Sequence, residues 1–288
     1  MAGEFFQYLQ AHAKEDPSHP AIIDGESCLS YSDFVSQIEC FASALSKLNL
    51  NSNSKIGLLC LNQKEYLIAF FAALLKGVPV IPFNFLLKPE DLAYIAQDAG
   101  IDTLLVDSVF VKPEVAPFFK FFANKILIGP ADLEQVGEGT LKWDEFIALG
   151  DPSDSQTKHK RGESLPDVIL YTSGTTAKPK GVMLTASNLN SNIEQCIHKT
   201  GFSKKDIFVV LLPQFHSFGF TVTTLLPSVI GAKTVYMARF NPRKVLELLR
   251  THRPTIILAF PSMYNAILNT NSATADDFQS LRLMGSGG

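Results

Sequence analysis

Short apolar runs alternate with amphipathic segments along most of the chain. Residues 55–61 (KIGLLCL) form a continuous apolar run of strand length. Residues 65–76 follow with apolar side chains at helical spacing, and Gly77 is a suitable helix end. The same alternation predicts further strands at residues 21–23, 29–31, 78–82, 103–106, 125–128, 168–172, 207–211, 233–236, 255–259 and 281–284. It predicts further helices at residues 5–14, up to about residue 47, and at 89–99, 187–199, 215–230, 242–251 and 261–269.

This order of elements predicts the fold class and its division. Strands that alternate with helices pair in parallel and are covered by helices on both faces, so we expect an α/β fold with parallel sheets. Residues 150–167 are polar throughout and offer the best internal boundary. We therefore expect a first α/β subdomain over residues 1–165 and a second over residues 166–288. Ligands of such sheets bind beyond the carboxyl ends of the strands, so binding residues are expected directly after strands.

Composition and charge exclude several classes of protein. Hydrophobic residues make up 46% of the chain and charged residues 18%, which excludes disorder for most of it. The 25 basic and 28 acidic residues give a net charge of −3, whereas a dedicated nucleic-acid binder carries a basic excess. The first ten residues lack the features of a signal peptide, and polar residues and Pro227 interrupt the longest apolar stretch. We expect a cytoplasmic protein with no transmembrane segment and no nucleic-acid partner.

One turn after a strand carries groups suited to phosphate. Residues 172–182 read TSGTTAKPKGV and supply glycines, hydroxyls and two lysines. Glycines let backbone N–H groups approach a ligand, and the hydroxyl and ammonium groups add donors, so this segment suits a polyphosphate. A Walker A loop is excluded, because six residues rather than four separate Gly174 from Gly181 and Val182 follows. On composition alone, a solvated polar loop remains an alternative.

Several segments resemble those of the adenylate-forming enzymes, which include acyl-CoA synthetases, luciferases and peptide-synthetase adenylation domains. YTSGTTAKPKGV (171–182) resembles their phosphate-loop signature, with Ala177 where the usual pattern has Gly. LLPQFHSFGFT (211–221) resembles the His-containing motif of the acyl-CoA and acyl-carrier-protein synthetases, and PSMYNAIL (261–268) resembles the helix beside their acyl pocket. LRLMGSGG (281–288) resembles the start of their adenine-binding segment. The chain thus resembles the N-terminal part of the large domain of such an enzyme.

The resemblance implies roles for individual residues. His216 is implied to lie near the acyl carboxylate, although a lone His among Phe residues is by default part of a core. Amino-acid-activating relatives have Asp at this position, so the His favours an apolar carboxylic acid. Lys180 is implied to act in catalysis on the phosphates, and Thr176 to bind Mg²⁺. The implied nucleotide-binding set is Thr172, Ser173, Gly174, Thr175, Thr176 and Lys180 in the loop, with Gly285, Ser286, Gly287 and Gly288 near the adenine.

The resemblance also implies a reaction. The complete enzyme is expected to join ATP and a carboxylic acid, with a fatty acid as the favoured class, into an acyl-adenylate, and then to form a thioester with CoA. ATP, Mg²⁺ and CoA are the implied cofactors and co-substrates. An acyl-carrier-protein ligase and a non-catalytic nucleotide- or lipid-binding protein remain as alternatives. The family's Mg²⁺ carboxylate and adenylation Lys lie beyond residue 288, so we expect this chain to be inactive by itself.

Overall fold

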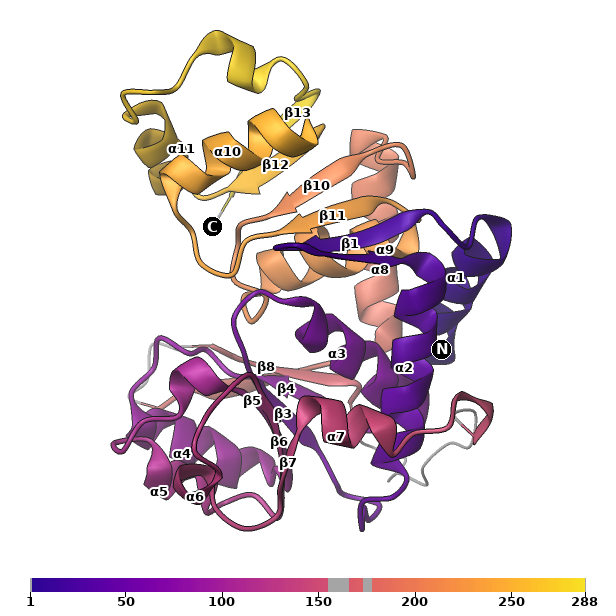
Figure 1. Cartoon of the computed structure of the whole chain (residues 1–288), viewed down its shortest axis with the longest axis vertical. Coiled ribbons are helices and arrows are strands. Elements are labelled where there is room, and N and C mark those ends of the chain that lie inside the picture. Colours follow the sequence, from indigo (N-terminus) through magenta and orange to yellow (C-terminus); the bar gives the residue numbers. More distant parts are fainter. Residues whose placement is uncertain (1, 155–165, 173–177, 288) are drawn as a thin grey trace. The chain divides into compact units, whose positions relative to one another are not determined.

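The computed structural model describes residues 2–154, 166–172 and 178–287, which form two compact units (Figure 1). The first unit comprises Met1–Phe6, Val35–Leu61 and Glu65–Asn188. The second unit comprises Gln7–Phe34, Asn62–Lys64 and Leu189–Gly288. Within these described ranges, each unit contains one sheet, and the two sheets are built from separate sets of strands.

A seven-stranded sheet is the centre of the first unit. Its strands are β3 (Ile56–Leu59), β4 (Val80–Pro82), β5 (Thr103–Asp107), β6 (Asn124–Ile128), β7 (Thr140–Lys142), β8 (Val168–Thr172) and β9 (Lys180–Leu184). They lie in the order β7-β6-β5-β3-β4-β8-β9. Neighbours are parallel except β8 and β9, which form an antiparallel hairpin at one edge. Strands β3 and β5 are buried along their whole length, as expected for parallel strands with both faces covered.

Helices cover both faces of this sheet (Figure 1). They are α2 (Tyr31–Leu45), α3 (Lys64–Lys76), α4 (Pro89–Ala99), α5 (Ala116–Phe119), α6 (Leu133–Val136) and α7 (Trp143–Ala148), with 3₁₀ turns at Ser108–Phe110 and Pro152–Asp154. Apolar side chains of α4, α5 and α6 pack against strand residues that include Leu104 and Ile169. On the opposite face, the ring of Phe41 in α2 lies 5.3 Å from that of Trp143 and 4.9 Å from that of Phe146 in α7.

A six-stranded sheet is the centre of the second unit. Its strands are β1 (Pro20–Asp24), β2 (Ser27–Ser30), β10 (Ile207–Val210), β11 (Lys233–Tyr236), β12 (Ile256–Ala259) and β13 (Leu283–Ser286). They lie in the order β13-β12-β10-β11-β1-β2, and only β1 and β2 are antiparallel neighbours. The carboxyl ends of the four strands β10 to β13 therefore share one edge of the sheet, where ligands of such sheets bind.

The second unit also carries helices on both faces of its sheet. They are α1 (Ala2–Glu15), α8 (Ala186–Thr200), the π-helical segment η3 (Gly219–Leu225), α9 (Leu226–Val229), α10 (Pro242–His252), α11 (Pro261–Leu268) and the 3₁₀ turn η4 (Ala275–Phe278). Val245 and Leu249 of α10 and Ile267 of α11 pack against strand residues Val209 and Ile257. Segments η3 and α9 contact β10 and β11. Within the described ranges, no helix combines the length and apolar character needed to cross a bilayer.

The predicted α/β fold with parallel sheets and helices on both faces is confirmed, except at two edges. Strand β2 runs antiparallel to β1, and the unpredicted strand β9 runs antiparallel to β8. Both pairs are joined by connections too short for the crossover that parallel pairing needs. The sequence also did not predict β7, because three residues give too short an apolar pattern.

The division between the units differs from the predicted boundary at residue 165. Val168 of β8 pairs with Val80 of β4, so residues after the polar segment join the first sheet. Ile22 of β1 pairs with Thr234 of β11, so residues near the N-terminus join the second sheet. Both pairings link segments far apart in sequence, and local polarity carries no information on them.

Candidate functional site

The hairpin of β8 and β9 carries the two ends of the predicted phosphate loop. Thr172 is the last residue of β8 and lies opposite Lys180, the first residue of β9. Both side chains are exposed, so a hydroxyl and an ammonium group at the base of the loop are available to an anionic ligand. The other predicted residues of this loop, Ser173, Gly174, Thr175 and Thr176, lie outside the described residues, as does Gly288.

Gly181 has a packing role in this hairpin. It pairs directly with Tyr171 across the two strands. A Cβ at Gly181 would come within 2.8 Å of Cγ2 of Ile169 and 3.1 Å of Cζ of Tyr171. The glycine therefore lets the Tyr171 ring lie across the hairpin, which any larger residue would prevent without a shift.

His216 lies in the second unit, between β10 and η3. The backbone N–H of Phe218 donates to its Nδ1 at 3.3 Å. In a neutral imidazole the accepting nitrogen carries no proton, so Nε2 is then the N–H donor. The ring of Phe260 meets the His216 ring edge to face, with centroids 5.5 Å apart. His216 thus offers one hydrogen-bond donor beside an aromatic ring, which suits a carboxylate attached to an apolar group.

The glycine-rich end of β13 lies beside the His216 segment. A Cβ at Gly287 would lie 3.5 Å from Cε1 of Phe218, an ordinary packing distance. A Cβ at Gly285 would come within 2.4 Å of Cδ2 of Leu258 on the neighbouring strand, so a side chain there would require Leu258 to move. Ser286 is exposed at the end of the strand. Three of the predicted adenine-segment residues thus lie at the same sheet edge as His216.

Helix α11 is tied to this edge by Tyr264. Its hydroxyl lies 2.8 Å from the carbonyl oxygen of Gly285 and 2.9 Å from that of Ile257. Burial raises the pKa of Tyr264 to about 12, so the hydroxyl stays protonated and donates. This contact fixes the backbone of β13 where the predicted adenine segment begins.

The π-helical segment η3 begins three residues after His216. Hydroxyls of Thr223 and Thr224 both donate to the carbonyl oxygen of Gly219, at 2.7 and 2.9 Å. A Cβ at Gly219 would come within 2.3 Å of the carbonyl oxygen of Pro213, so the chain turns back closely on itself here. The sequence predicted one regular helix over residues 215–230. π-Helical turns are frequent at functional sites, where they change the direction of a segment.

Two buried amides hold the segment that leads to His216, and the sequence analysis missed both. The Asn62 side chain donates to the carbonyl oxygens of Leu212 and Met237 at 3.1 and 3.2 Å and accepts from the backbone N–H of Gln214 at 2.9 Å. Gln214 accepts from the backbone N–H of Gln63 at 3.1 Å. Both amides are buried, so these bonds have no competition from water. A single amide directly after a buried apolar run is the signal that could have revealed Asn62.

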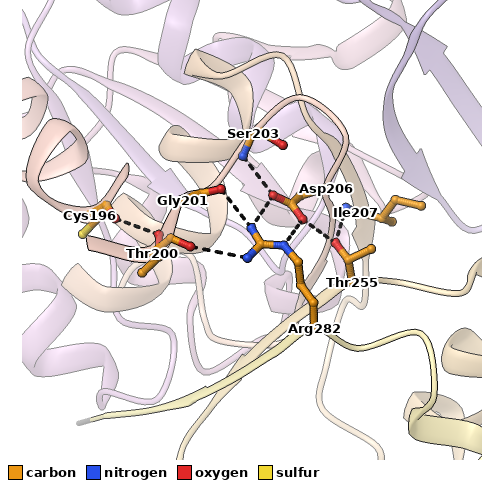
Figure 2. A network of polar contacts seen from close by, with 8 residues as sticks. All are labelled: Cys196, Thr200, Gly201, Ser203, Asp206, Ile207, Thr255 and Arg282. Carbon is orange, nitrogen blue, oxygen red and sulfur yellow. Dashed lines mark hydrogen bonds and ion pairs between the residues drawn. The ribbon is translucent and has the colours of Figure 1, made fainter. Parts of the chain in front are cut away.

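A second polar network holds the start of β13 (Figure 2). Nε and Nη2 of Arg282 donate to the two carboxylate oxygens of Asp206 at 2.7 and 2.6 Å, which is a bidentate pair. Asp206 also accepts from the Thr255 hydroxyl at 2.8 Å and from the backbone N–H of Ser203 at 2.9 Å. The carboxylate is only 3% exposed, yet every described contact on it is a donor. The network therefore fixes β13 to the segments before β10 and β12.

This network predicts an acid-sensitive stability. Burial would raise the pKa of Asp206, but hydrogen bonds from Arg282, Ser203 and Thr255 outweigh burial and lower it below the ordinary value of 3.8. Folding therefore favours the ionised carboxyl, and this stabilisation is complete above the ordinary pKa and is lost as the pH falls through the folded one. We expect the stability difference between wild type and Asp206→Asn to be constant above about pH 5 and to shrink below about pH 4. Denaturant titrations across this range test it, and a difference that grows toward low pH would contradict it.

The described side chains offer no ready-made metal site. No group of three His, Cys, Asp or Glu in the described ranges is placed to hold a metal ion. Mg²⁺ prefers oxygen ligands and usually binds through substrate phosphates with one or two protein oxygens. A Mg²⁺ ion that is carried by the phosphates of a nucleotide needs no cage of protein ligands.

The chain is similar to CoA ligases both in sequence and in fold. The chain is 29% identical over 299 residues to the long-chain-fatty-acid–CoA ligase of Yersinia pestis, covering 93% of this chain and 52% of that protein. It is 26% identical over 300 residues to 4-coumarate–CoA ligase 1 of Oryza sativa subsp. japonica, covering 98% and 51%. The chain thus spans about half the length of the curated relatives it matches.

The chain also matches a solved structure and a family model. The anthranilate CoA ligase AuaEII, solved in complex with anthranoyl-AMP, matches with a TM-score of 0.84 at 22% identity, over 99% of this chain and 56% of that one. At this identity the likeness speaks for the fold. The model of the family described as AMP-binding enzyme matches residues 9–288. Because that match covers nearly the whole chain, the chain belongs to the AMP-binding enzyme family.

Proposed function

We propose that the protein to which this chain belongs activates an apolar carboxylic acid with ATP and transfers the acyl group to the thiol of CoA. The observation that carries the proposal is the convergence at one sheet edge of the second unit. There His216, with Nε2 as its donor, lies among Phe218, Phe260 and the glycines of β13. The relatives named above are acid–CoA ligases, which supports the same reaction.

The first step joins the acid to the nucleotide. A carboxylate oxygen attacks the α-phosphorus of ATP in line, the bond to pyrophosphate breaks, and an acyl-adenylate forms. No covalent bond to the enzyme is needed, so the chain's residues contribute position and charge stabilisation. His216 would orient the carboxylate through Nε2–H. Thr172 and Lys180, with Ser173, Gly174, Thr175 and Thr176, would hold the β- and γ-phosphates, and Gly285 to Gly288 would lie by the adenine.

Mg²⁺ fits this arrangement as a companion of the phosphates. When bound there, the ion would neutralise part of the negative charge on the leaving pyrophosphate. Thr176 is our proposed protein ligand for it. The ammonium of Lys180 supplies positive charge at the base of the same loop.

The second step transfers the acyl group. The sulfur of a thiol loses its proton to solvent and attacks the acyl carbon, and the bond from that carbon to the AMP oxygen breaks, which gives a thioester and AMP. We propose CoA as the thiol and a fatty acid as the favoured substrate, because His216 lies against aromatic rings and carries no fixed negative charge that could pair with a substrate amine. Parallel assays with CoA and a carrier protein separate these two acceptors.

His216→Ala tests the proposed role of the imidazole. Loss of one charge-assisted hydrogen bond should raise the KM for the acid about tenfold, while the KM for ATP stays within about twofold. Initial rates of pyrophosphate release with a fatty acid as variable substrate measure the effect. His198→Ala, at an exposed position of α8, is the matched control and should leave both constants unchanged. An equal rise in both KM values would contradict the assignment.

A further inference from the structure

The second half of α4 contacts residues on both sides of the predicted phosphate loop. Tyr171, the residue before Thr172, donates its hydroxyl to Oδ2 of Asp98 at 2.5 Å. The ammonium of Lys178, two residues before β9, lies 4.8 Å from the centre of the Tyr94 ring. Tyr94 and Asp98 are one helical turn apart and therefore lie on the same face of α4.

Several contacts fix the position of the Tyr171 side chain. Its ring crosses the hairpin over Gly181, where a Cβ would approach Cζ to 3.1 Å. The ring also packs against the core of the first unit, as does that of Tyr94. Burial and the Asp98 carboxylate raise the pKa of Tyr171 well above its ordinary value, so its hydroxyl remains a donor. The hydroxyl of Tyr94 reaches the other oxygen of Asp98 at 3.4 Å.

The contact at Lys178 has a different physical basis. A cation above an aromatic ring is attracted to the negative face of the π-system. Lys178 is exposed and Tyr94 is half-buried, so the ring is the fixed partner and the lysine the one that is held. Tyr171 and Lys178 are therefore attached to α4 by interactions of two different kinds, a hydrogen bond and a cation–π contact.

We propose that Tyr94 and Asp98 are positioning residues for Thr172 and Lys180, and that they set the affinity of these two residues for the β- and γ-phosphates. This inference rests on the proposed ATP site. Thr172 follows Tyr171 directly, and Lys180 lies two residues after Lys178, so a shift of Tyr171 or Lys178 displaces a proposed phosphate ligand. AMP has no β- or γ-phosphate. The attachment to α4 should thus affect ATP and leave AMP unaffected.

The test compares the affinities of the protein for ATP with Mg²⁺ and for AMP by calorimetry. Tyr171→Phe keeps the ring over Gly181 and removes the hydroxyl, and it should weaken ATP binding about fivefold with AMP binding within about twofold. Tyr94→Leu removes the ring and should weaken ATP about threefold. Tyr94→Phe is the conservative variant that keeps the ring and loses the hydroxyl, and it should restore most of the ATP affinity that Tyr94→Leu loses.

The possible results distinguish failure of the positioning role from failure of the proposed function. Equal losses for ATP and AMP would mean a merely structural role and would overturn the inference, as would unchanged ATP affinity in both Tyr171→Phe and Tyr94→Leu. Wild-type protein that binds neither nucleotide would contradict the proposed function itself, and the inference with it. Amide exchange of β8 and β9 gives a readout without nucleotide, and faster exchange is expected in Tyr171→Phe but not in Tyr94→Phe.

Discussion

Lys180→Ala is expected to lower the rate of acid-dependent pyrophosphate release by about two orders of magnitude or more in the full-length protein. Lys180 is the first residue of β9, is exposed, and lies opposite Thr172 at the base of the proposed phosphate loop. A charge-assisted contact from its ammonium to the phosphate that carries charge in the transition state contributes on the order of 2–4 kcal/mol. Each 1.4 kcal/mol is about a factor of ten in rate.

The measurement is initial pyrophosphate release at saturating acid and ATP. Lys112→Ala is the control, because Lys112 is another exposed lysine of the first unit and lies away from the β8–β9 hairpin in the sequence. It should behave as wild type. An unchanged rate in Lys180→Ala would remove Lys180 from the catalytic assignment.

Arg282→Met is expected to destabilise the second unit by about 2–3 kcal/mol and to weaken AMP binding. The substitution keeps much of the side-chain length but leaves Asp206 buried without its main cationic partner (Figure 2). The loss of stability is partly offset because the Arg282 side chain is 40% exposed, so water can reach this position. Arg282 directly precedes β13, so a loosened network should also displace the glycines proposed to lie by the adenine.

The chain offers a matched control for this prediction. Arg250 of α10 forms a comparable pair with Asp277, with Nε to Oδ1 at 2.6 Å and side chains 47% and 5% exposed. That pair joins α10 to η4 and includes no residue of β13. Arg250→Met should therefore destabilise the unit similarly and leave AMP binding within about twofold. Equal loss of AMP binding in both variants would contradict a specific role for the Arg282 network, and chemical denaturation with calorimetry measures both quantities.

The sequence predicted most of the elements because their apolar patterns are local. Helix α4 over residues 89–99 and strand β8 over residues 168–172 begin and end where the sequence places them. Buried parallel strands have continuous apolar runs, and helices between them have one apolar face, so both patterns can be recognised in short windows. The hairpin strand β9 was missed because its exposed residues, which include Val182 and Met183, have no alternation and follow a segment rich in turn residues.

In the candidate site, too, residues in local sequence patterns could be predicted, whereas residues held by long-range contacts could not. His216 and the glycines of β13 could be predicted because they directly follow strands and belong to segments that resemble a known family. The contacts of Asn62 with the His216 segment, and of Asp206 with Arg282, join residues at least 76 positions apart. Such pairs depend on strand order, which an amphipathic pattern does not encode. The same holds for Asp98 and Tyr171, which are 73 positions apart.

Detection of the acyl-adenylate is the most direct test of the proposed acid activation with ATP. The full-length protein is incubated with ATP, Mg²⁺ and separate fatty, aromatic and amino acids, first without a thiol, and the products are identified by mass spectrometry. We expect acyl-AMP and an equal amount of pyrophosphate with apolar acids, and conversion of acyl-AMP to a thioester and AMP when CoA is added. Absence of acyl-AMP with every acid in the full-length protein, or its formation only with amino acids, would contradict the proposed function.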